Sequence, residues 1–461
     1  MIATGKGEKI MNPYIFRKYD IRGVVEEDFT DDVVINIGKA YGTLVKERGG
    51  KKIALSGDVR KTTPRLKKLI SKGILSTGID VVDIGILPTP ANYFSMYTMD
   101  VQGAVQVTGS HNPPDMNGFK MSYNKQSVYG DDIQKLKEII ENEEFAEGKG
   151  NFSEEDILEK YNEEIVSNIK LEKDIKVAVD CGNGAACLSA PEALKAIGCE
   201  TTEFYCDVDG SFPNHHPDPT VKEYIQDLIK EVKNGDYDFG VAFDGDADRI
   251  GVIDDTGSII WADYIMILFL DEVIKDGEKV IFDVKCSQAL EDMIKEKGGT
   301  PFMWKTGHSL IKEKMREENI DFAGEMSGHI CFADDYYGYD DAIYAALRFA
   351  QMLSRKSEKL SEIMAKLPHY QSTPEMRLEC PDDKAKFEIA EKAAAYFKEN
   401  YECIDVDGVR IKFGDGWGLV RASNTQPVIV TRFEAQTEER LEEIKELVLS
   451  KLKSFGEIEM P

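Results

Sequence analysis

Three aspartates on alternate residues, Asp244, Asp246 and Asp248, form the segment DGDADR together with Arg249. In an extended or tightly turned loop, alternate carboxylates can aim at one point, as a hard divalent cation requires of its oxygen ligands. An EF-hand is rejected, because it needs a glycine where this chain has Arg249 and helices where strand-like apolar sequence flanks the loop. Arg249 would suit a phosphoryl group shared between a cation and a guanidinium. The segment predicts a metal site for phosphate chemistry, with a solvated acidic turn as the alternative.

A serine occupies a second loop, TGSHNPPDMNGFK, at residues 108–120. A serine-hydrolase hypothesis has little support, because no G-x-S-x-G elbow is present and because Ser110 directly precedes His111, a poor geometry for a nucleophile and its base. Glycine, serine, asparagine and proline also form ordinary turns, which is the alternative. Lys120, however, places a cation where the loop re-enters regular structure, as a serine that carries a phosphoryl group would require.

Three further loops have the chemistry of sugar recognition. GEMSGH offers the carboxylate of Glu325, the hydroxyl of Ser327 and the imidazole of His329 between two glycines, and a polyol is bound by donors and acceptors of this kind. VKCS and KTGHS follow predicted strands of the same region and bring Lys285 and His308. The alternatives are a glycine-hinged turn, surface lysines and a serine that caps a helix.

Two segments have the composition of phosphate sites. RASNTQP, residues 421–427, surrounds the guanidinium of Arg421 with hydroxyl and amide donors, which make a nest for a dianionic phosphate. FRKYDIRG, residues 16–23, packs three cationic side chains and Tyr19 into one stretch. A polar turn and a solvated charged face are the alternatives. Together the loops favour one shared site with a divalent metal, a serine, phosphate-binding cations and a polyol-binding loop.

A threefold repeat positions three of these loops. Apolar strands and amphipathic helices alternate as β-α-β-α-β three times, and each pass runs from its last strand into a loop of unusual composition. The predicted strands are residues 52–57, 81–84 and 104–107, then 176–180, 201–205 and 240–243, then 279–282, 300–304 and 321–323. The predicted helices are residues 63–74, 190–197, 222–232, 290–296 and 310–317. This alternation indicates mostly parallel sheets covered on both faces, which bind ligands outside the carboxyl ends of their strands.

The remainder of the chain has a different pattern. Strands are predicted at residues 376–378, 409–413, 418–421 and 428–433, with helices at 384–396 and 438–452 and a hairpin-like turn at GDGWG. Helices segregated from antiparallel strands indicate a small α+β domain. A length of 461 residues alone suggests about three domains, but the repeat raises the number to four. The predicted domains are residues 1–153, 154–257, 258–369 and 370–461.

Composition excludes several classes of protein. The chain carries 57 Lys and Arg against 84 Asp and Glu, a net charge of −27. Such a field repels polyanions, so neither a nucleic-acid partner nor a membrane partner is expected. The longest apolar stretch, at residues 265–270, is far shorter than a membrane span, and no secretory signal is recognised. Eight scattered cysteines without a C-x-x-C are typical of reduced thiols, so a cytoplasmic protein is expected.

With FRKYDIRG, TGSHNPP, DGDADR, GEMSGH and RASNTQP in this order, essentially the whole chain resembles the α-D-phosphohexomutase superfamily, specifically the bacterial phosphomannomutase/phosphoglucomutase branch. The resemblance implies three related α/β/α domains with mixed, mostly parallel sheets. It also implies a C-terminal α+β domain of the TATA-box-binding-protein type, all around a central cleft. Met326 stands where phosphoglucosamine mutases tend to carry glutamine, which disfavours an amino sugar. Ala247, where many relatives have glycine, leaves the three carboxylates in place.

The implied activity is reversible interconversion of hexose 1-phosphate and hexose 6-phosphate, with mannose, glucose or both as the sugar. It runs through a phosphoserine enzyme and a hexose 1,6-bisphosphate, which is both intermediate and activator. Ser110 would be the phosphoserine, and with Asp244, Asp246 and Asp248 it would hold one Mg²⁺ per subunit. The implied catalytic residues are Ser110, Lys120, Arg249, His329 and Arg22. The implied substrate-binding residues are Tyr19, Lys285, His308, Glu325, Met326, Ser327, Gly328, His329, Arg421, Ala422, Ser423, Asn424 and Thr425.

Three other functions stay open at this point. A phosphoglucosamine mutase would use the same machinery on an amino sugar. A metal-dependent sugar-phosphate phosphatase would release the phosphoryl group to water. A non-catalytic sensor of sugar phosphates would usually have lost Ser110 or one of the three aspartates. The expected partners are small hexose phosphates, and the expected state is a monomer or weak dimer.

Overall fold

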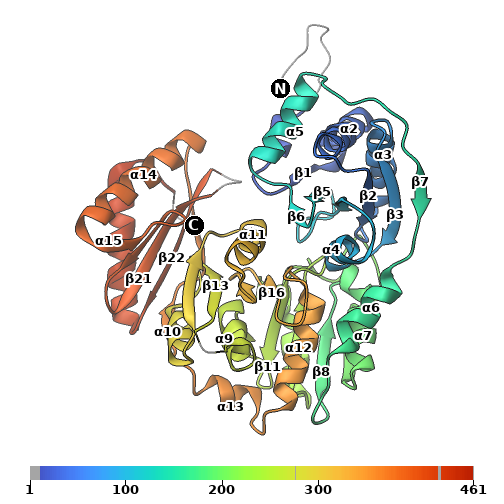
Figure 1. Ribbon diagram of the computed structural model, residues 1–461. Coiled ribbons are helices and arrows are strands. Elements are labelled where there is room, and N and C mark those ends of the chain that lie inside the picture. The colour runs from blue at the N-terminus through green and yellow to red at the C-terminus, as the bar shows by residue number, and fades with distance from the viewer. Residues whose placement is uncertain (1–10, 276, 424–426, 460–461) are drawn as a thin grey trace. The chain divides into compact units, whose positions relative to one another are not determined.

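The computed structural model describes residues 11–275, 277–423 and 427–459. The chain divides into two compact units, whose helices and strands are labelled in Figure 1. Unit 1 comprises Met1–Ala262 and Ser327–Ile363, and unit 2 comprises Asp263–Met326 and Met364–Pro461. Each unit therefore consists of two separate stretches of the chain.

The first sheet of unit 1 has the strand order β1-β5-β4-β2-β3-β7, with β6 paired to β5. Its strands are β1 (Ile21–Val24), β2 (Lys52–Gly57), β3 (Asp80–Ile86), β4 (Gly103–Val107), β5 (Met116–Tyr123), β6 (Gln126–Ser127) and β7 (Phe152–Glu154). The helices of this region are α1 (Val25–Asp28), α2 (Asp31–Glu47), α3 (Thr63–Leu75), α4 (Thr89–Thr98), α5 (Asp131–Glu141) and the short 3-10 helix η1 (Pro13–Ile15). β2 is parallel to β3 and β4, whereas β5 returns antiparallel to β4. The loop that carries Ser110 joins β4 to β5.

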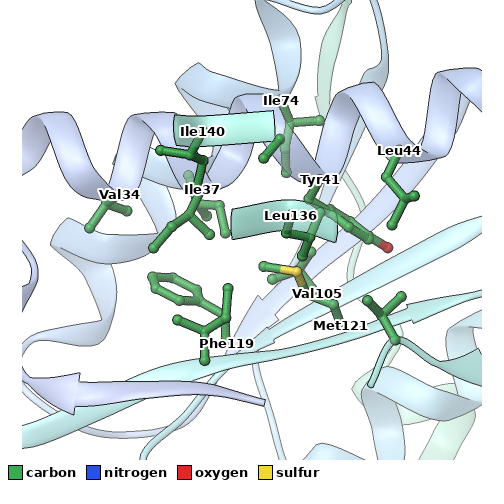
Figure 2. Packing of buried hydrophobic residues seen from close by; sticks show 14 of the residues in the cluster. Val34, Ile37, Tyr41, Leu44, Ile74, Val105, Phe119, Met121, Leu136 and Ile140 are labelled. Carbon is green, nitrogen blue, oxygen red and sulfur yellow. The ribbon is translucent and has the colours of Figure 1, made fainter. Parts of the chain in front are cut away.

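Helix α2 supplies much of the core of this region but was not predicted from the sequence. Its side chains Val34, Ile37, Tyr41 and Leu44 recur at helical spacing and are fully buried. Figure 2 shows them packed with side chains of α3, α5, β4 and β5. The labelled partners are Ile74, Val105, Phe119, Met121, Leu136 and Ile140. The hydroxyl of Tyr41 donates to the backbone carbonyl of Ser122, which fastens the helix to β5.

The second sheet of unit 1 has the order β12-β11-β10-β8-β9. Its strands are β8 (Lys176–Asp180), β9 (Glu200–Phe204), β10 (Phe239–Phe243), β11 (Ile250–Asp254) and β12 (Ile259–Ile260). Near it lie α6 (Leu158–Ser167), η2 (Ala185–Leu188), α7 (Ala190–Ala196), α8 (Gln226–Asn234) and α12 (Ala342–Ser354), while β16 (Ile330–Phe332) contacts α12. β8 is parallel to β9 and β10, and β11 is antiparallel to β10. DGDADR is the turn between β10 and β11.

Helix α8 begins four residues later than the sequence predicted. Residues 214–220 contain two prolines and form a turn in which the Asp218 carboxylate accepts from the backbone N–H of Thr220, 3.0 Å, and from its hydroxyl, 2.6 Å. Residues 222–225, where the helix was predicted to begin, also form a turn, and the backbone N–H of Tyr224 donates to the carbonyl of Val221 at 3.0 Å.

Unit 2 contains a parallel group of strands and an antiparallel sheet. β13 (Lys279–Asp283) is parallel to both β14 (Thr300–Trp304) and β15 (Phe322–Gly324). The antiparallel sheet has the order β17-β22-β21-β20-β19, with β18 also on β22. Its strands are β17 (Gln371–Ser372), β18 (Met376–Glu379), β19 (Glu402–Ile404), β20 (Val409–Lys412), β21 (Gly416–Ala422) and β22 (Val428–Ala435). The helices are α9 (Ala262–Val273), α10 (Gln288–Glu296), α11 (His308–Glu318), α13 (Leu360–Met364), α14 (Asp383–Asn400) and α15 (Glu438–Phe455), of which α9 and α13 lie across the limits of the unit.

The predicted fold class is confirmed. Every strand expected from the three passes is present, and the C-terminal strands form an antiparallel sheet that shares one core with α14 and α15. The sheets of unit 1 are mixed, because β5 and β11 turn back beside the last parallel strand of each pass. Within the described residues, no helix is long and apolar enough to cross a membrane.

Candidate active site

The turn between β10 and β11 gathers the three alternate aspartates. Asp244, Asp246 and Asp248 are completely buried, and each contributes an oxygen to a cluster whose atoms lie within 4.8 Å of one another. Ala247 has a φ of 64°, in the left-handed region that favours glycine. The tight turn thus explains the convergence of the carboxylates.

Lys120 on β5 partly neutralises this cluster. Its ammonium donates to Asp246 Oδ2 at 2.7 Å and also pairs with Asp248, and the hydroxyl of Thr89 donates to the same Asp246 oxygen at 2.6 Å. Burial opposes the charged form of Lys120, but the surrounding carboxylates outweigh it and raise the pKa of the ammonium. Burial, together with Asp246 and Asp248, raises the pKa of Asp244 well above its usual range.

Two oxygens of the cluster lack a hydrogen-bond donor. Asp246 Oδ1 and Asp248 Oδ1 are buried, and no described residue donates to either of them. An unpaired buried carboxylate oxygen is costly, and a hard cation bound to it would remove that cost. The residues present therefore fit a divalent cation with oxygen ligands.

Ser110 lies against this cluster in a constrained conformation. Its φ is 49°, and its hydroxyl donates to Asp244 Oδ2 at 3.0 Å. His111 Nδ1 lies 3.1 Å from the same hydroxyl oxygen, a contact between adjacent residues that was not predicted from the sequence. Burial and the nearby cations Arg249 and Arg22 lower the pKa of His111 well below its usual range, which keeps the imidazole neutral.

Arg249 and His329 contact each other beside the cluster. Arg249 Nε lies 3.1 Å from His329 Nε2, which therefore accepts the hydrogen bond. His329 Nδ1 lies 3.1 Å from a carboxylate oxygen of Asp340 and 3.1 Å from the backbone carbonyl of Asp248. These partners place the ring proton on Nδ1 and fix the orientation of a nearly buried imidazole.

The N-terminal segment lies next to the strand that carries Lys120. Arg22 is on β1 and pairs in register with Gly118 of β5, and its guanidinium binds Asp20 at 2.5 Å. The ammonium of Lys18 lies over the ring of Tyr19, 5.7 Å from the ring centre.

The predicted sugar loop is divided between the units. Ser327, Gly328 and His329 belong to unit 1, whereas Glu325 and Met326 belong to unit 2. Gly328 has a φ of 95°, and a Cβ there would lie 2.7 Å from the carbonyl of Ile250, at the end of the metal loop. The glycine thus permits the loop to approach β11 closely.

Asp283 organises the predicted substrate residues of unit 2 at the end of β13. It accepts from the backbone N–H of Met326 at 3.1 Å and lies 4.0 Å from the ammonium of Lys285. Lys285 also pairs with Glu375 at 3.2 Å, and although burial opposes its charge, these carboxylates raise its pKa. Glu325 accepts at 2.5 Å from the backbone N–H of Gly307, immediately before His308.

Arg421, at the end of β21, is nearly buried beside a carboxylate. Its Nε donates to Asp407 at 2.6 Å, and Asp407 also accepts from the backbone N–H of Thr306 at 3.1 Å. Ala422 follows Arg421 and pairs with Ile429 of β22, and Ser423, two residues after Arg421, is also buried. Asn424 and Thr425 lie outside the described residues.

Two arginines of the antiparallel sheet hold the loop that carries Lys285. Arg410 Nη1 donates to the carbonyls of Val284 at 2.8 Å and Cys286 at 2.7 Å, and Arg432 donates to the carbonyl of Lys285. The Arg410 guanidinium lies 3.7 Å from the ring centre of Trp417, and burial lowers the pKa of Arg410 to about 10. Three consecutive carbonyls thus depend on two side chains from β20 and β22.

Sequence reasoning missed the residues that hold the predicted ones in place. Thr89 and Asp340 contact Asp246 and His329, and Glu375 and Asp407 contact Lys285 and Arg421. Only Asp283 had a usable signal, because it directly follows the predicted strand at residues 279–282 and stands two residues before Lys285. The others stand in segments with several similar residues, where spacing does not single one out.

Family models of consecutive domains match most of the chain. Their descriptions read phosphoglucomutase/phosphomannomutase, with alpha/beta/alpha domain I at residues 13–147, domain II at 159–257, domain III at 261–370 and the C-terminal domain at 375–451.

Individual relatives are similar over nearly their whole length. A phosphomannomutase/phosphoglucomutase of Pseudomonas aeruginosa is 44% identical over 445 residues, which cover 95% of this chain and 96% of the relative. A phosphoglucomutase of Neisseria meningitidis is 44% identical, covering 94% and 95%. The crystal structure of a phosphoglucomutase/phosphomannomutase family protein from Burkholderia thailandensis is similar with a TM-score of 0.91 and 41% identity, covering 97% of this chain and 99% of that one.

Proposed function

Because the chain belongs to the phosphoglucomutase/phosphomannomutase family of phosphohexomutases, enzymes of the isomerase class, we propose that Ser110 carries the transferred phosphoryl group. The substrates would be hexose 1-phosphates and hexose 6-phosphates of glucose, mannose or both. One observation carries the proposal: the Ser110 hydroxyl lies 3.0 Å from Asp244, in a buried carboxylate cluster that retains two oxygens without donors.

The chemistry needs a carrier that survives between turnovers. The bond between phosphorus and Ser110 Oγ breaks while a bond forms to the free hydroxyl of a hexose monophosphate, and that hydroxyl loses its proton to a base. The product is a hexose 1,6-bisphosphate, which turns and returns its other phosphoryl group to Ser110. Lys120, His329 and Arg22 are the candidates for proton transfer, and His329 Nε2 is the ring nitrogen with a lone pair.

Charge neutralisation and positioning supply most of the rate in phosphoryl transfer. Ser110, Asp244, Asp246 and Asp248 would hold Mg²⁺, whose role when bound is to withdraw charge from the phosphoryl oxygens. Arg249 and Lys120 add fixed positive charge in a buried site, where charge acts strongly because water does not screen it.

Substrate recognition is assigned to the remaining predicted residues. Glu325, Ser327 and His329 would bind sugar hydroxyls, and Tyr19, Lys285 and His308 would complete the substrate contacts, with Met326 and Gly328 shaping the loop. Arg421 and Ser423, together with Ala422 and the undescribed Asn424 and Thr425, would bind the phosphate that is not transferred. Lys285 and Arg421 each pair with a carboxylate, and a phosphate of the substrate could take the place of that carboxylate. These ion pairs support the assignment of both cations to substrate binding.

The test is a product balance on a panel of glucose, mannose, glucosamine and N-acetylglucosamine 1-phosphates, with Mg²⁺ and glucose 1,6-bisphosphate present. We expect hexose 6-phosphate to form from the glucose or mannose ester with no matching release of inorganic phosphate. Stoichiometric inorganic phosphate would instead establish a phosphatase. Preferential turnover of the glucosamine ester would establish a phosphoglucosamine mutase.

Arg421→Ala is expected to raise KM for the hexose phosphate by about 10- to 100-fold, with a smaller effect on kcat, because it removes charged hydrogen bonds to a phosphate that stays bound. Steady-state kinetics measures both constants. Arg440→Ala is the control, since Arg440 pairs with Asp415 on the surface of the same unit. An unchanged KM for the Arg421 variant would remove Arg421 from the phosphate site.

We also propose a cytoplasmic enzyme, because all eight cysteines are free. A monomer or weak dimer remains a prediction.

A further inference from the structure

The Ser110 loop, residues 108–116, is held by hydrogen bonds to its backbone carbonyls. The side chains that donate these hydrogen bonds are not among the predicted site residues. The Arg60 guanidinium donates to four carbonyl oxygens of the loop, and His216 Nε2 donates to a fifth. The acceptors of Arg60 are Ser110 at 2.7 Å, Asn112 at 2.6 Å, Pro113 at 2.6 Å and Met116 at 3.1 Å, and the acceptor of His216 is His111. Every carbonyl from residue 110 to residue 113 therefore accepts from one of two side chains.

Arg60 is itself fixed on every side. It is 1% exposed, its Nε donates to Asp58 at 3.1 Å, and its guanidinium lies 5.0 Å from the ring centre of Phe212. Asp58 also accepts from the hydroxyl of Thr108 at 2.8 Å and from the backbone N–H of Gly109 at 3.2 Å. Asp58 thus anchors the start of the loop, and Arg60 anchors the rest.

The same carbonyls lie next to the metal loop. A Cβ on Gly245 would collide with the carbonyl oxygen of Ser110, so the two loops touch through their backbones. His216 approaches from the turn at residues 214–220, which follows β9 in the second sheet. The Ser110 backbone is therefore confined between elements of both sheets of unit 1.

A fixed guanidinium suits this task for electrostatic reasons. Carbonyl oxygens carry partial negative charge, and a loop that bears a phosphoserine dianion is destabilised if they turn toward it. Arginine presents five donors in one plane and never loses its charge, whereas lysine has three donors on one atom. Ser110 also has a positive φ, a conformation that persists only where its surroundings impose it.

We propose that Arg60, assisted by His216, is a positioning residue that holds the Ser110 loop with its carbonyls turned away from the phosphoryl group and thereby sets the rate of phosphoryl transfer. This proposal rests on the proposed role of Ser110. Within the described residues, the polar and ring contacts of the Arg60 side chain are with Asp58, the Ser110 loop and Phe212, none of which is assigned to substrate binding, so its effect should fall on kcat and not on KM.

The test compares Arg60→Lys, His216→Phe and His216→Gln with the wild-type enzyme. We expect Arg60→Lys to lower kcat about 100-fold at a nearly unchanged KM, because displacements near 1 Å cost about this much. The same substitution should slow the phosphorylation of Ser110 by glucose 1,6-bisphosphate to a similar extent, which intact-mass measurements would report. It should also accelerate amide hydrogen exchange in residues 108–116. His216→Phe should lower kcat less, and His216→Gln, which keeps a donor, should restore part of the loss.

Arg348→Lys is the matched control, because Arg348 is also buried in unit 1 but pairs with Asp334 and, within the described residues, has no hydrogen bond to the Ser110 loop. It should keep wild-type kcat per folded molecule. An Arg60→Lys enzyme with wild-type kcat, or one whose loss only matches its loss of folded protein, would overturn the positioning role while leaving the proposed function intact. A wild-type enzyme that forms no hexose 6-phosphate would instead overturn the proposed function.

Discussion

Replacing Ser110 with alanine is expected to lower mutase turnover by on the order of 10⁴-fold or more, because the proposed carrier of the phosphoryl group would be lost and the other groups would act only through it. The variant should also take up no phosphoryl group from glucose 1,6-bisphosphate. Coupled detection of hexose 6-phosphate and intact mass measure the two effects. Binding of hexose phosphate should persist, since Ser110 is not among the residues assigned to sugar or distal phosphate.

Ser95→Ala provides the control for this loss. Ser95 is as buried as Ser110 in unit 1, but its hydroxyl only donates to the carbonyl of Asn92 within helix α4. We expect near wild-type activity from this variant and unchanged thermal unfolding from both. If the Ser110 variant turned over at the wild-type rate, the phosphoryl carrier would have to be another residue.

Asp246→Asn is expected to lower activity at saturating Mg²⁺ by about 10³-fold, several kcal/mol of transition-state stabilisation. Asp246 supplies one of the cluster's two buried oxygens to which no described residue donates, and an amide offers a cation less charge. The wild-type protein should gain thermal stability on adding Mg²⁺, about 2.7 kcal/mol at a hundred times Kd, and the variant should gain much less. Unfolding scans with and without Mg²⁺ report this independently of turnover.

The control for the metal site is Asp254→Asn at the end of β11. Asp254 is also nearly buried in unit 1, but its carboxylate accepts from the backbone N–H groups of Thr256 and Ser258, a role that an amide oxygen can fill. This variant should keep the Mg²⁺ response. An Asp246 variant with a wild-type response would show that Mg²⁺ binds elsewhere.

The strands and the acidic loop could be predicted from the sequence because their signals are local. Residues 52–57 and 176–180 are short apolar runs that the structure reproduces as β2 and β8, and three alternate carboxylates converge in a single turn. Helix α2 has an equally local pattern in Val34, Ile37 and Tyr41, but it precedes the first repeat and was missed. The tight turn at Ala247 could not be seen, because alanine does not mark a positive φ as glycine does.

The partners of the candidate residues could not be predicted, because they depend on contacts that are distant in the sequence. Arg60 reaches the Ser110 carbonyl across 50 residues, and His216 reaches the His111 carbonyl across 105. Both bonds end on backbone oxygens, which every residue has, so no side-chain pattern reveals them. The contact between Ser110 and His111 was also not predicted, and Ser110 has a positive φ that its residue type does not indicate.

If Lys285 and Arg421 bind the substrate as proposed, the hydrogen bonds from Arg410 and Arg432 to the Lys285 loop would make unit 2 selective for ligand length. Arg421 lies on β21, between the strands that carry those two arginines, so Lys285 and Arg421 keep a fixed spacing within the unit. A bisphosphate that turned end for end would then have to fit the same spacing in both poses. Sugar phosphates would be selected by their length as well as by their pattern of hydroxyls.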